Sequence, residues 1–211
     1  MDDIVEIALA TRPDCINETY LKELDDLLAT NAPEMNLTVE LGLQTVNYHT
    51  LQGINRGHTL AEFIDAVLSA QKYGAEVTVH LILNLPGDNR VDCIEAAKIL
   101  SALGVDTIKL HALYIRENST FGELYKKGKL TPISREEYVE RVILFLEHLS
   151  PEIAVQRLLG RAPREKSLFV NWGVSWWEIK QEIEEKLKKR NTCQGKKYNY
   201  LQGKALDIFS K

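Results

Sequence analysis

Cysteine is scarce in this sequence, and the few cysteines lie far apart. Only three occur among the 211 residues, at Cys15, Cys93 and Cys193. No two of them have the CxxC or CxxxC spacing of a metal-binding loop or a redox motif. We therefore expect neither a disulfide framework nor a cysteine-rich metal site contained in this chain.

Long hydrophobic runs and a strong charge of one sign are also absent. The longest apolar runs, such as Val142–Leu146, are too short to cross a bilayer, and the acidic start at Met1–Ile4 lacks the basic region of a signal peptide. The 26 Lys and Arg against 30 Asp and Glu give a net charge of −4, which argues against a dedicated duplex-DNA binder. These features predict a protein of the reducing cytoplasm with no membrane partner.

An alternation of short apolar runs and amphipathic segments fills the first half of the chain. The apolar runs predict strands, and the segments between a capping residue and a glycine predict helices. The expected strands are 4–10, 37–45, 76–85 and 107–115, and the expected helices are 18–29, 60–73 and 90–103. Strands that alternate with helices of this length are typical of βα units with a parallel sheet.

The second half has a different pattern. Ser134, with Glu137 three residues later, has the spacing of a capping box and predicts a helix that runs to about Leu149. Residues 154–158 are a candidate for a further strand. This half therefore predicts mainly helices, with at most one short strand.

A basic region with tryptophans follows. Residues 180–190 predict a charged helix, and 180–197 contains seven basic and three acidic residues, a net charge of +4. Trp172, Trp176 and Trp177 come just before it. Aromatic rings beside basic residues are the elements of an RNA-binding surface. The alternative, which we favour, is aromatic packing of a C-terminal helix whose charged face is solvated.

Polar side chains share one face of the predicted strands. Because successive strand residues point to opposite faces, Val39, Leu41 and Leu43 lie on one side of the second strand. The other faces of the strands carry Glu40, Gln44, His80, Asn84, Lys109 and His111. A doubly wound sheet buries both faces, and a closed eight-stranded barrel fills its interior with branched side chains. A polar lumen fits neither, and it predicts an open, partial βα barrel that holds a polar ligand.

Two interpretations of these polar residues stay open. An unpaired buried amide or hydroxyl costs about 1–3 kcal/mol and an unpaired charge costs more, so each group needs a partner. In one interpretation Glu40, Lys109 and the histidines satisfy one another in a structural network. In the other, which we favour for the whole set, they surround a ligand at the carboxyl ends of the strands.

Several short motifs, in their order along the chain, resemble one known superfamily. They are Thr11–Cys15, Glu40–Thr45, Ile54–His58, His80–Asp88, Ile108–His111, Tyr125–Gly128, Gln156–Leu158, Ala162–Arg164, Lys189–Arg190 and Gln194–Gly195. In this order they are similar to the radical S-adenosylmethionine (SAM) superfamily. The resemblance is strongest to a bacterial family called YhcC-like and more distant to the Elongator subunit 3 enzymes, and it covers almost the whole chain.

The resemblance implies a fold and two cofactors. The fold is α/β, a partial (βα) barrel of six parallel strands, of which about four are expected here. It assigns residues 1–118 to the C-terminal part of this barrel and 119–211 to a family-specific extension with helices and a basic tail. In the superfamily, a [4Fe-4S] cluster held by a CxxxCxxC loop reduces SAM to a 5′-deoxyadenosyl radical.

The resemblance also implies roles for individual residues. Gln44 corresponds to a SAM contact near the ribose, and Arg56 to one near the methionine carboxylate, where a guanidinium can form two charge-assisted hydrogen bonds. His80 occupies a strand position where related enzymes place a polar ribose ligand. The substrate end of the lumen is implied to contain Arg12, Glu40, Lys109 and His111.

The chain departs from the superfamily pattern in ways that bear on activity. The cluster loop and the Gly-rich strand that contacts the SAM amino group are absent, so the chain resembles the C-terminal two-thirds of a radical SAM protein. We expect it to be inactive alone as a radical enzyme. Ala10 and Asn84 stand where relatives carry a SAM-binding Glu and a Gly, and Arg161 stands where they carry an acidic residue. The first strand is then an exposed edge that favours self-association.

The favoured function is a SAM-binding radical enzyme domain of the Fe–S oxidoreductase type, with RNA as one candidate substrate by analogy with the Elongator relatives. Two alternatives stay open. One is a non-catalytic binding or interaction module whose basic tail contacts RNA or a protein. The other is a cluster-free βα-barrel enzyme that acts on a small polar metabolite.

Overall fold

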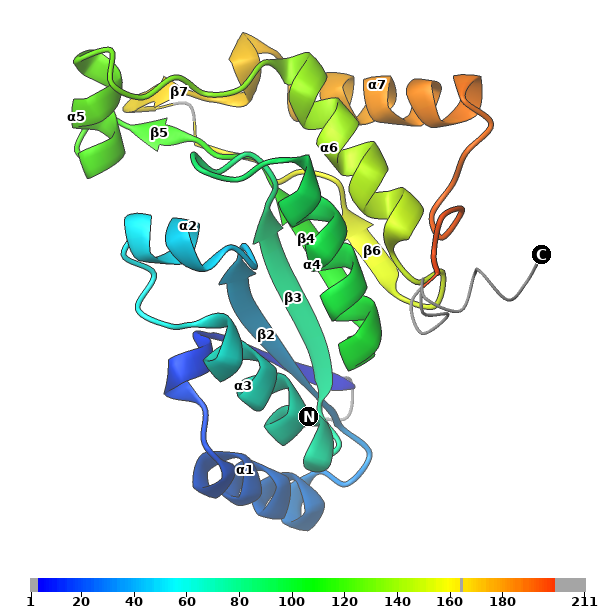
Figure 1. Ribbon diagram of the computed structural model, residues 1–211. Coiled ribbons are helices and arrows are strands. Elements are labelled where there is room, and N and C mark those ends of the chain that lie inside the picture. Colours follow the sequence, from blue (N-terminus) through cyan, green and yellow to red (C-terminus); the bar gives the residue numbers. More distant parts are fainter. Residues whose placement is uncertain (1–3, 164, 200–211) are drawn as a thin grey trace, which may run out of the picture.

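The computed structural model describes residues 4–163 and 165–199. Its centre is a parallel sheet with the strand order β1-β2-β3-β4-β6 (Figure 1). The strands are β1 (Glu6–Thr11), β2 (Asn36–Gln44), β3 (Glu76–Ile82), β4 (Thr107–His111) and β6 (Ala154–Arg157). The predicted α/β class and parallel sheet are confirmed. The sheet has five strands where about four were expected, because the candidate strand at 154–158 pairs with β4.

The described helices are α1 (Glu18–Asn31), α2 (Tyr48–Gly53), α3 (Leu60–Lys72), α4 (Arg90–Leu103), α5 (Thr120–Lys126), α6 (Arg135–His148) and α7 (Trp176–Lys189). Of these, α3 and α4 lie against one face of the sheet (Figure 1). Two 3₁₀ turns, Pro13–Cys15 and Asn171–Gly173, and a small antiparallel pair, β5 (Ile115–Arg116) with β7 (Ser167–Phe169), complete the described elements.

The predicted helix starts are confirmed by their capping hydrogen bonds. The side chains of Asn17, Thr59 and Asn89 accept backbone N–H groups at the starts of α1, α3 and α4. Ser134 caps α6 in the same way, but the carboxylate of Glu137 accepts hydrogen bonds from arginines instead of completing the predicted capping box. That carboxylate therefore ties α6 to α4 through Arg90.

The aliphatic face of the sheet forms the hydrophobic core. The strand side chains Val39, Leu41, Val79, Leu81, Ile108 and Leu110 are at most 2% exposed and pack with the buried faces of α3, α4 and α6. The burial of each whole aliphatic side chain contributes about 1.5–3 kcal/mol. A strand that slipped by one residue would expose all of these side chains to solvent, so burial fixes which residues of each strand face the core. The opposite face of each strand therefore carries the polar side chains.

Two predicted strands end earlier than expected: β3 stops at Ile82 instead of residue 85, and β4 stops at His111 instead of residue 115. The buried side chain of Asn84 accepts the backbone N–H of Leu113, which holds the loops after β3 and β4 together. The segment after β2, for which no helix was predicted, contains α2, whose start is capped by Asn47. Asparagine is a preferred N-cap residue, so Asn47 is a local sequence signal for this helix.

The charged C-terminal helix packs on the rest of the protein. On α7 and just after it, Lys186 and Arg190 both pair with Glu140 of α6. The Trp172 ring contacts Tyr138 and its indole N–H donates to the carbonyl of Ile133. The favoured packing interpretation therefore describes α7 better than an open basic surface does. The motif residue Arg164 and the tail beyond residue 199 lie outside the described residues.

Two surface properties were also expected from the sequence. The strand β1 lies at one edge of the described sheet and is mostly exposed, as predicted, whereas self-association through it stays a prediction. In the part of the chain that the structure describes, every helix is too short or too polar to cross a membrane.

We predict that the core on α3 controls stability. Phe63 is fully buried, so Phe63→Ala should lower the free energy of unfolding by about 3–5 kcal/mol. Leu68 lies on the same helix but is 54% exposed, so Leu68→Ala should cost less than about 1 kcal/mol. Urea unfolding measures both values. Equal losses from the two variants would show that α3 does not pack as described.

Candidate functional site

Four of the predicted site residues meet on the polar face of the sheet. Glu40 of β2 accepts a hydrogen bond from Lys109 of β4, with Oε1 and Nζ 2.5 Å apart. The other carboxylate oxygen lies 2.9 Å from Nε2 of His80 on β3. The second nitrogen of His80, Nδ1, lies 2.9 Å from Nε2 of His111. The parallel register therefore brings residues from three strands into one chain of contacts.

A fifth residue, Arg157 of β6, extends this chain and was not assigned a role from the sequence. Its Nη2 atom lies 2.6 Å from Nε2 of His111. The position depends on an irregularity in the pairing of β4 with β6, where Ile108 faces Val155 but Lys109 faces Arg157. The intervening Gln156 is an extra residue, and strand parity alone does not reveal such a bulge.

The surroundings shift the proton affinities of these groups in opposite directions. Burial alone would raise the pKa of Glu40, but hydrogen bonds from Lys109 and His80 outweigh it and hold the pKa below its usual value. Burial, together with the nearby charge of Arg157, lowers the pKa of His111 to about 4. At neutral pH the site therefore contains an ionised Glu40 and a neutral His111.

The contact chain borders an open cavity. The cavity has a volume of about 220 Å³ and is lined by Ala10, Thr11, Glu40, Gly42, Gln44, His80, Ile82 and His111. The side chains of Glu40 and His80 are 17% and 21% exposed, so they are neither sealed from solvent nor directed into bulk water. The mutual pairing matches the structural-network interpretation, and the cavity matches the ligand-site interpretation.

Of the two predicted SAM contacts, Gln44 lines this cavity, whereas Arg56 lines another cavity of about 360 Å³; both side chains approach Gly42 at a bulge in β2. Gly42 pairs with His80 and Gln44 pairs with Leu81, so one residue of β2 is extra. The Arg56 guanidinium donates to the carbonyl of Gly42 from both Nε and Nη2, at 3.1 and 2.8 Å. A Cβ at Gly42 would clash with the head groups of Arg56 and Gln44. Glycine therefore allows an amide and a guanidinium to lie together over the strand.

Arg12 does not join the group to which the sequence assigned it. Its guanidinium pairs with Asp14 and lies against Gly57, the residue that follows Arg56. Burial and the nearby charge of Arg12 both lower the pKa of Arg56. Arg12 and Arg56 thus form a pair of cations, with Asp14 as the neighbouring carboxylate.

The cysteines do not form a metal site. Cys15 and Cys193 are exposed, and Cys93 is buried in α4, where burial raises its thiol pKa to about 12. Within residues 4–163 and 165–199, no group of three or more His, Cys, Asp or Glu side chains is arranged to hold a metal ion. The described residues therefore do not fit a [4Fe-4S] cluster, which needs several thiolates close together.

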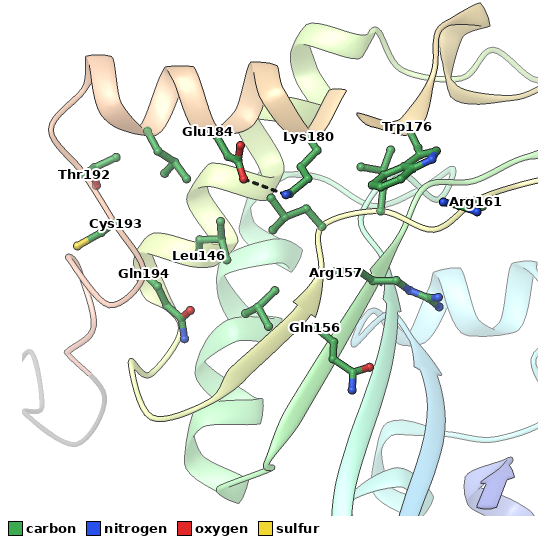
Figure 2. Close-up of a pocket in the computed structure, with 14 residues that line it drawn as sticks. Leu146, Gln156, Arg157, Arg161, Trp176, Lys180, Glu184, Thr192, Cys193 and Gln194 are labelled. Atoms are coloured by element: carbon green, nitrogen blue, oxygen red, sulfur yellow. Dashed lines mark ion pairs between the residues drawn. The ribbon is translucent and has the colours of Figure 1, made fainter. Parts of the chain in front are cut away.

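A larger cavity, of about 870 Å³, lies between β6, α6 and α7, where no site was expected from the sequence. Figure 2 shows Lys180 and Glu184 extending from α7 above it, with Gln156 and Arg157 on β6. Lys180 pairs with Glu184 at 3.3 Å, and the Arg161 guanidinium lies 5.2 Å from the centre of the Trp176 ring. Arg157 therefore lies between this cavity and the polar lumen.

We predict that the charge of Glu40 stabilises the protein in a pH-dependent way. A carboxyl group whose pKa is lowered by folding stabilises the protein above its unfolded-state pKa, and this contribution is lost as the pH falls through the folded-state pKa. Glu40→Gln should therefore lower the free energy of unfolding at pH about 7, and the deficit should shrink below pH about 4.

Denaturant unfolding at several pH values measures this deficit. The control is Glu18→Gln, which removes an exposed carboxylate paired with Lys72 and should change stability little at any pH. A deficit for Glu40→Gln that stays constant from neutral to acidic pH would contradict the described pairing.

Comparison with known proteins connects this geometry to a family. The model of the radical SAM superfamily matches residues 1–100, and that of the radical SAM C-terminal domain matches residues 105–189. YtqA of Bacillus subtilis is 37% identical over 202 residues, which cover 96% of this chain and 62% of that protein. YhcC of Escherichia coli K12 is 34% identical over 176 residues, covering 83% of this chain and 56% of that protein.

More distant similarity extends to other proteins. A tRNA uridine(34) acetyltransferase of Methanocaldococcus jannaschii is 29% identical over 151 residues, or 70% of this chain and 26% of that protein. The structure of Elp3 from Methanocaldococcus infernus with an N-terminal deletion has a TM-score of 0.75 at 22% identity, covering 90% of this chain and 43% of that one. It shows a shared fold.

The chain spans about 60% of the length of the first curated relatives it matches, YtqA and YhcC. The two family matches follow one another along the chain and cover residues 1–100 and 105–189. With the relatives at more than 30% identity and the shared fold, they show that the chain belongs to the radical SAM superfamily.

Proposed function

We propose that this chain forms the SAM-binding and substrate-binding part of a radical SAM enzyme that acts on RNA. The observation that carries the proposal is the convergence of charged and polar side chains from four adjacent parallel strands beside a cavity at the carboxyl edge of the sheet. Parallel βα proteins place their chemistry at that edge. Residues 1–118 are proposed as barrel and 119–211 as extension, with β6 contributed by the latter.

SAM would be held at the bulge in β2. The donor set fits an amino-acid carboxylate and a ribose, because the bare Cα of Gly42 leaves room for the Arg56 guanidinium and the Gln44 amide side by side. The cations of Arg56 and Arg12 favour a carboxylate there. When bound in this superfamily, SAM supplies a 5′-deoxyadenosyl radical.

The lumen residues would position the substrate. Glu40 and Lys109 pair with each other and fix the two charges in place, so that they need little reorganisation when a ligand enters. His80 and His111 line the cavity and can hold or accept a proton. The [4Fe-4S] cluster has no fitting ligands among the described residues, so its attachment is not assigned to this part of the chain.

RNA, and more narrowly tRNA, is the substrate class that we propose. The support is the similarity of this chain to a tRNA uridine(34) acetyltransferase over 70% of its length. The cations of the lumen and of its rim suit a phosphate-rich ligand.

We predict that Arg56 contributes to SAM binding. Arg56→Ala leaves the methionine carboxylate without a charged partner and should weaken binding by about 2 kcal/mol, or more than tenfold. Isothermal calorimetry with SAM measures this. Arg116 is exposed on β5, away from the lumen, and Arg116→Ala serves as the control with unchanged affinity. Equal affinities for the Arg56→Ala variant and the unmodified chain would remove Arg56 from the site.

A second prediction concerns the cluster. After anaerobic incubation with iron and sulfide, the chain should not bind iron and sulfide in the ratio of a [4Fe-4S] cluster, because its described cysteines lie far apart along the chain and no three metal-binding side chains gather among the described residues. Iron analysis and visible absorption measure the outcome. A stoichiometric cluster that supports SAM cleavage would contradict the proposed division of the enzyme.

A further inference from the structure

The large cavity beside β6 continues into a second cavity at the C-terminal end of α7. The first has a volume of about 870 Å³ and the second about 710 Å³, and both are lined by Glu184, Leu187, Thr192 and Cys193. Figure 2 shows Cys193 at one side of the first cavity and Trp176 at the other. The two cavities together form one groove, which we call the α7 groove, from the Trp176 ring to the turn that follows α7.

The walls of the α7 groove are strongly basic. Its charged lining residues are five cations and one carboxylate, namely Arg157, Arg161, Lys180, Lys188, Lys196 and Glu184. The carboxylate pairs with Lys180 at 3.3 Å in an exposed contact that contributes little. The chain as a whole has a net charge of −4, so positive charge is concentrated in this groove and attracts a polyanion.

Packing of α7 on α6 does not use up these cations. Lys186 and Arg190 both pair with Glu140 of α6 and account for that packing. Lys188 and Lys196 are exposed, and among the described residues they form no ion pair. Packing and anion binding therefore use different basic side chains of the same region.

The other end of the groove offers planar groups. The Trp176 ring is half-buried, and the exposed Arg161 guanidinium lies over it, 5.2 Å from the ring centre. Indole rings and guanidinium planes both stack on unpaired nucleobases. The exposed amide of Gln156 lines the same cavity and has both a donor and an acceptor for the edge of a base. An acidic peptide would use the lysines and leave these groups without a role.

We propose that the α7 groove binds single-stranded RNA. Its phosphates lie on Lys188 and Lys196. One unpaired base lies against the Trp176 ring and the Arg161 guanidinium. A duplex does not fit this role, because its bases are stacked on each other and cannot reach an aromatic side chain.

This inference rests on the proposed RNA substrate and gives it a binding surface outside the lumen. Arg157 connects the two places. It lines the groove, and its Nη2 atom lies 2.6 Å from Nε2 of His111, which lines the lumen cavity. A strand bound in the groove therefore lies next to the proposed site of chemistry.

The lysines are tested by fluorescence anisotropy with a labelled oligouridylate of about 10 nucleotides and no SAM. The double variant Lys188→Gln/Lys196→Gln should bind about tenfold more weakly, and its slope of log affinity against log salt should fall by about 1.4, or about 0.7 for each lost phosphate contact. The control is Lys22→Gln/Lys129→Gln, which makes the same charge change at exposed lysines elsewhere and should alter neither value. Equal losses in the two double variants would overturn the groove.

The stacking end is tested at Trp176 in the same assay. Trp176→Leu should weaken binding about tenfold without changing the salt slope, and Trp176→Phe, which keeps a ring, should retain most of the affinity. Trp177→Leu removes an adjacent ring that is 54% exposed and is the control with unchanged affinity. Circular dichroism verifies the fold of each variant. Full affinity in Trp176→Leu, or equal losses in Trp176→Leu and Trp176→Phe, would overturn the base contact.

The cysteines locate the bound strand on the unmodified chain, so this test does not depend on a variant that folds. Cys193 lines the groove, whereas Cys15 follows β1 at the opposite edge of the sheet, and both are exposed. Bound oligouridylate should slow the reaction of Cys193 with N-ethylmaleimide and leave Cys15 unchanged, as measured by mass spectrometry of the peptides. Protection of both cysteines alike, or of neither, would overturn the groove.

Competition separates RNA from other polyanions. Polyglutamate and inorganic polyphosphate of matched charge should displace the labelled strand less well than unlabelled oligouridylate does, and equal displacement would show a general anion surface and overturn the proposal. RNA that binds equally well to all groove variants would overturn the groove and leave the proposed RNA substrate in place. An unmodified chain that binds no RNA would overturn both.

Discussion

The carboxylate of Glu40 is the group on which the polar side of this sheet depends. It lies on the central part of β2 at 17% exposure, where an unpaired charge would be costly, and it accepts hydrogen bonds from Lys109 and His80. These two bonds join β2, β3 and β4 on the face that the helices leave open. The contact with His80 then continues through His111 to Arg157 on β6. One partly buried carboxylate thus begins a chain of contacts that links four strands.

The same arrangement links stability to ligand binding. Groups that are paired and partly buried keep fixed orientations, which is the preorganisation that a binding site needs. The pairing also leaves more positive than negative charge in the lumen, so the network is satisfied internally and still attracts an anion. The structural-network and ligand-site interpretations are therefore compatible in this protein, because the contacts that hold the strands together also orient the side chains that line the cavity.

Much of this could be predicted from the sequence, because it depends on local rules. Capping by Thr59 and strand parity at Glu40 and His80 involve neighbouring residues and a fixed period of two. Arg157 could not be predicted in the same way, since a bulge at Gln156 changes the parity just before it. The position of Arg12 depends on its pairing with Asp14 beyond the strand end, where parity no longer applies.

The central claim is that the polar lumen is a ligand site, and a crystal structure of the chain grown with SAM tests it most directly. The claim predicts adenosyl density beside Gln44 and His80, with the methionine carboxylate on Arg56. A structure with SAM bound elsewhere, or with the lumen empty at saturating SAM and its side chains in contact only with each other, would contradict it.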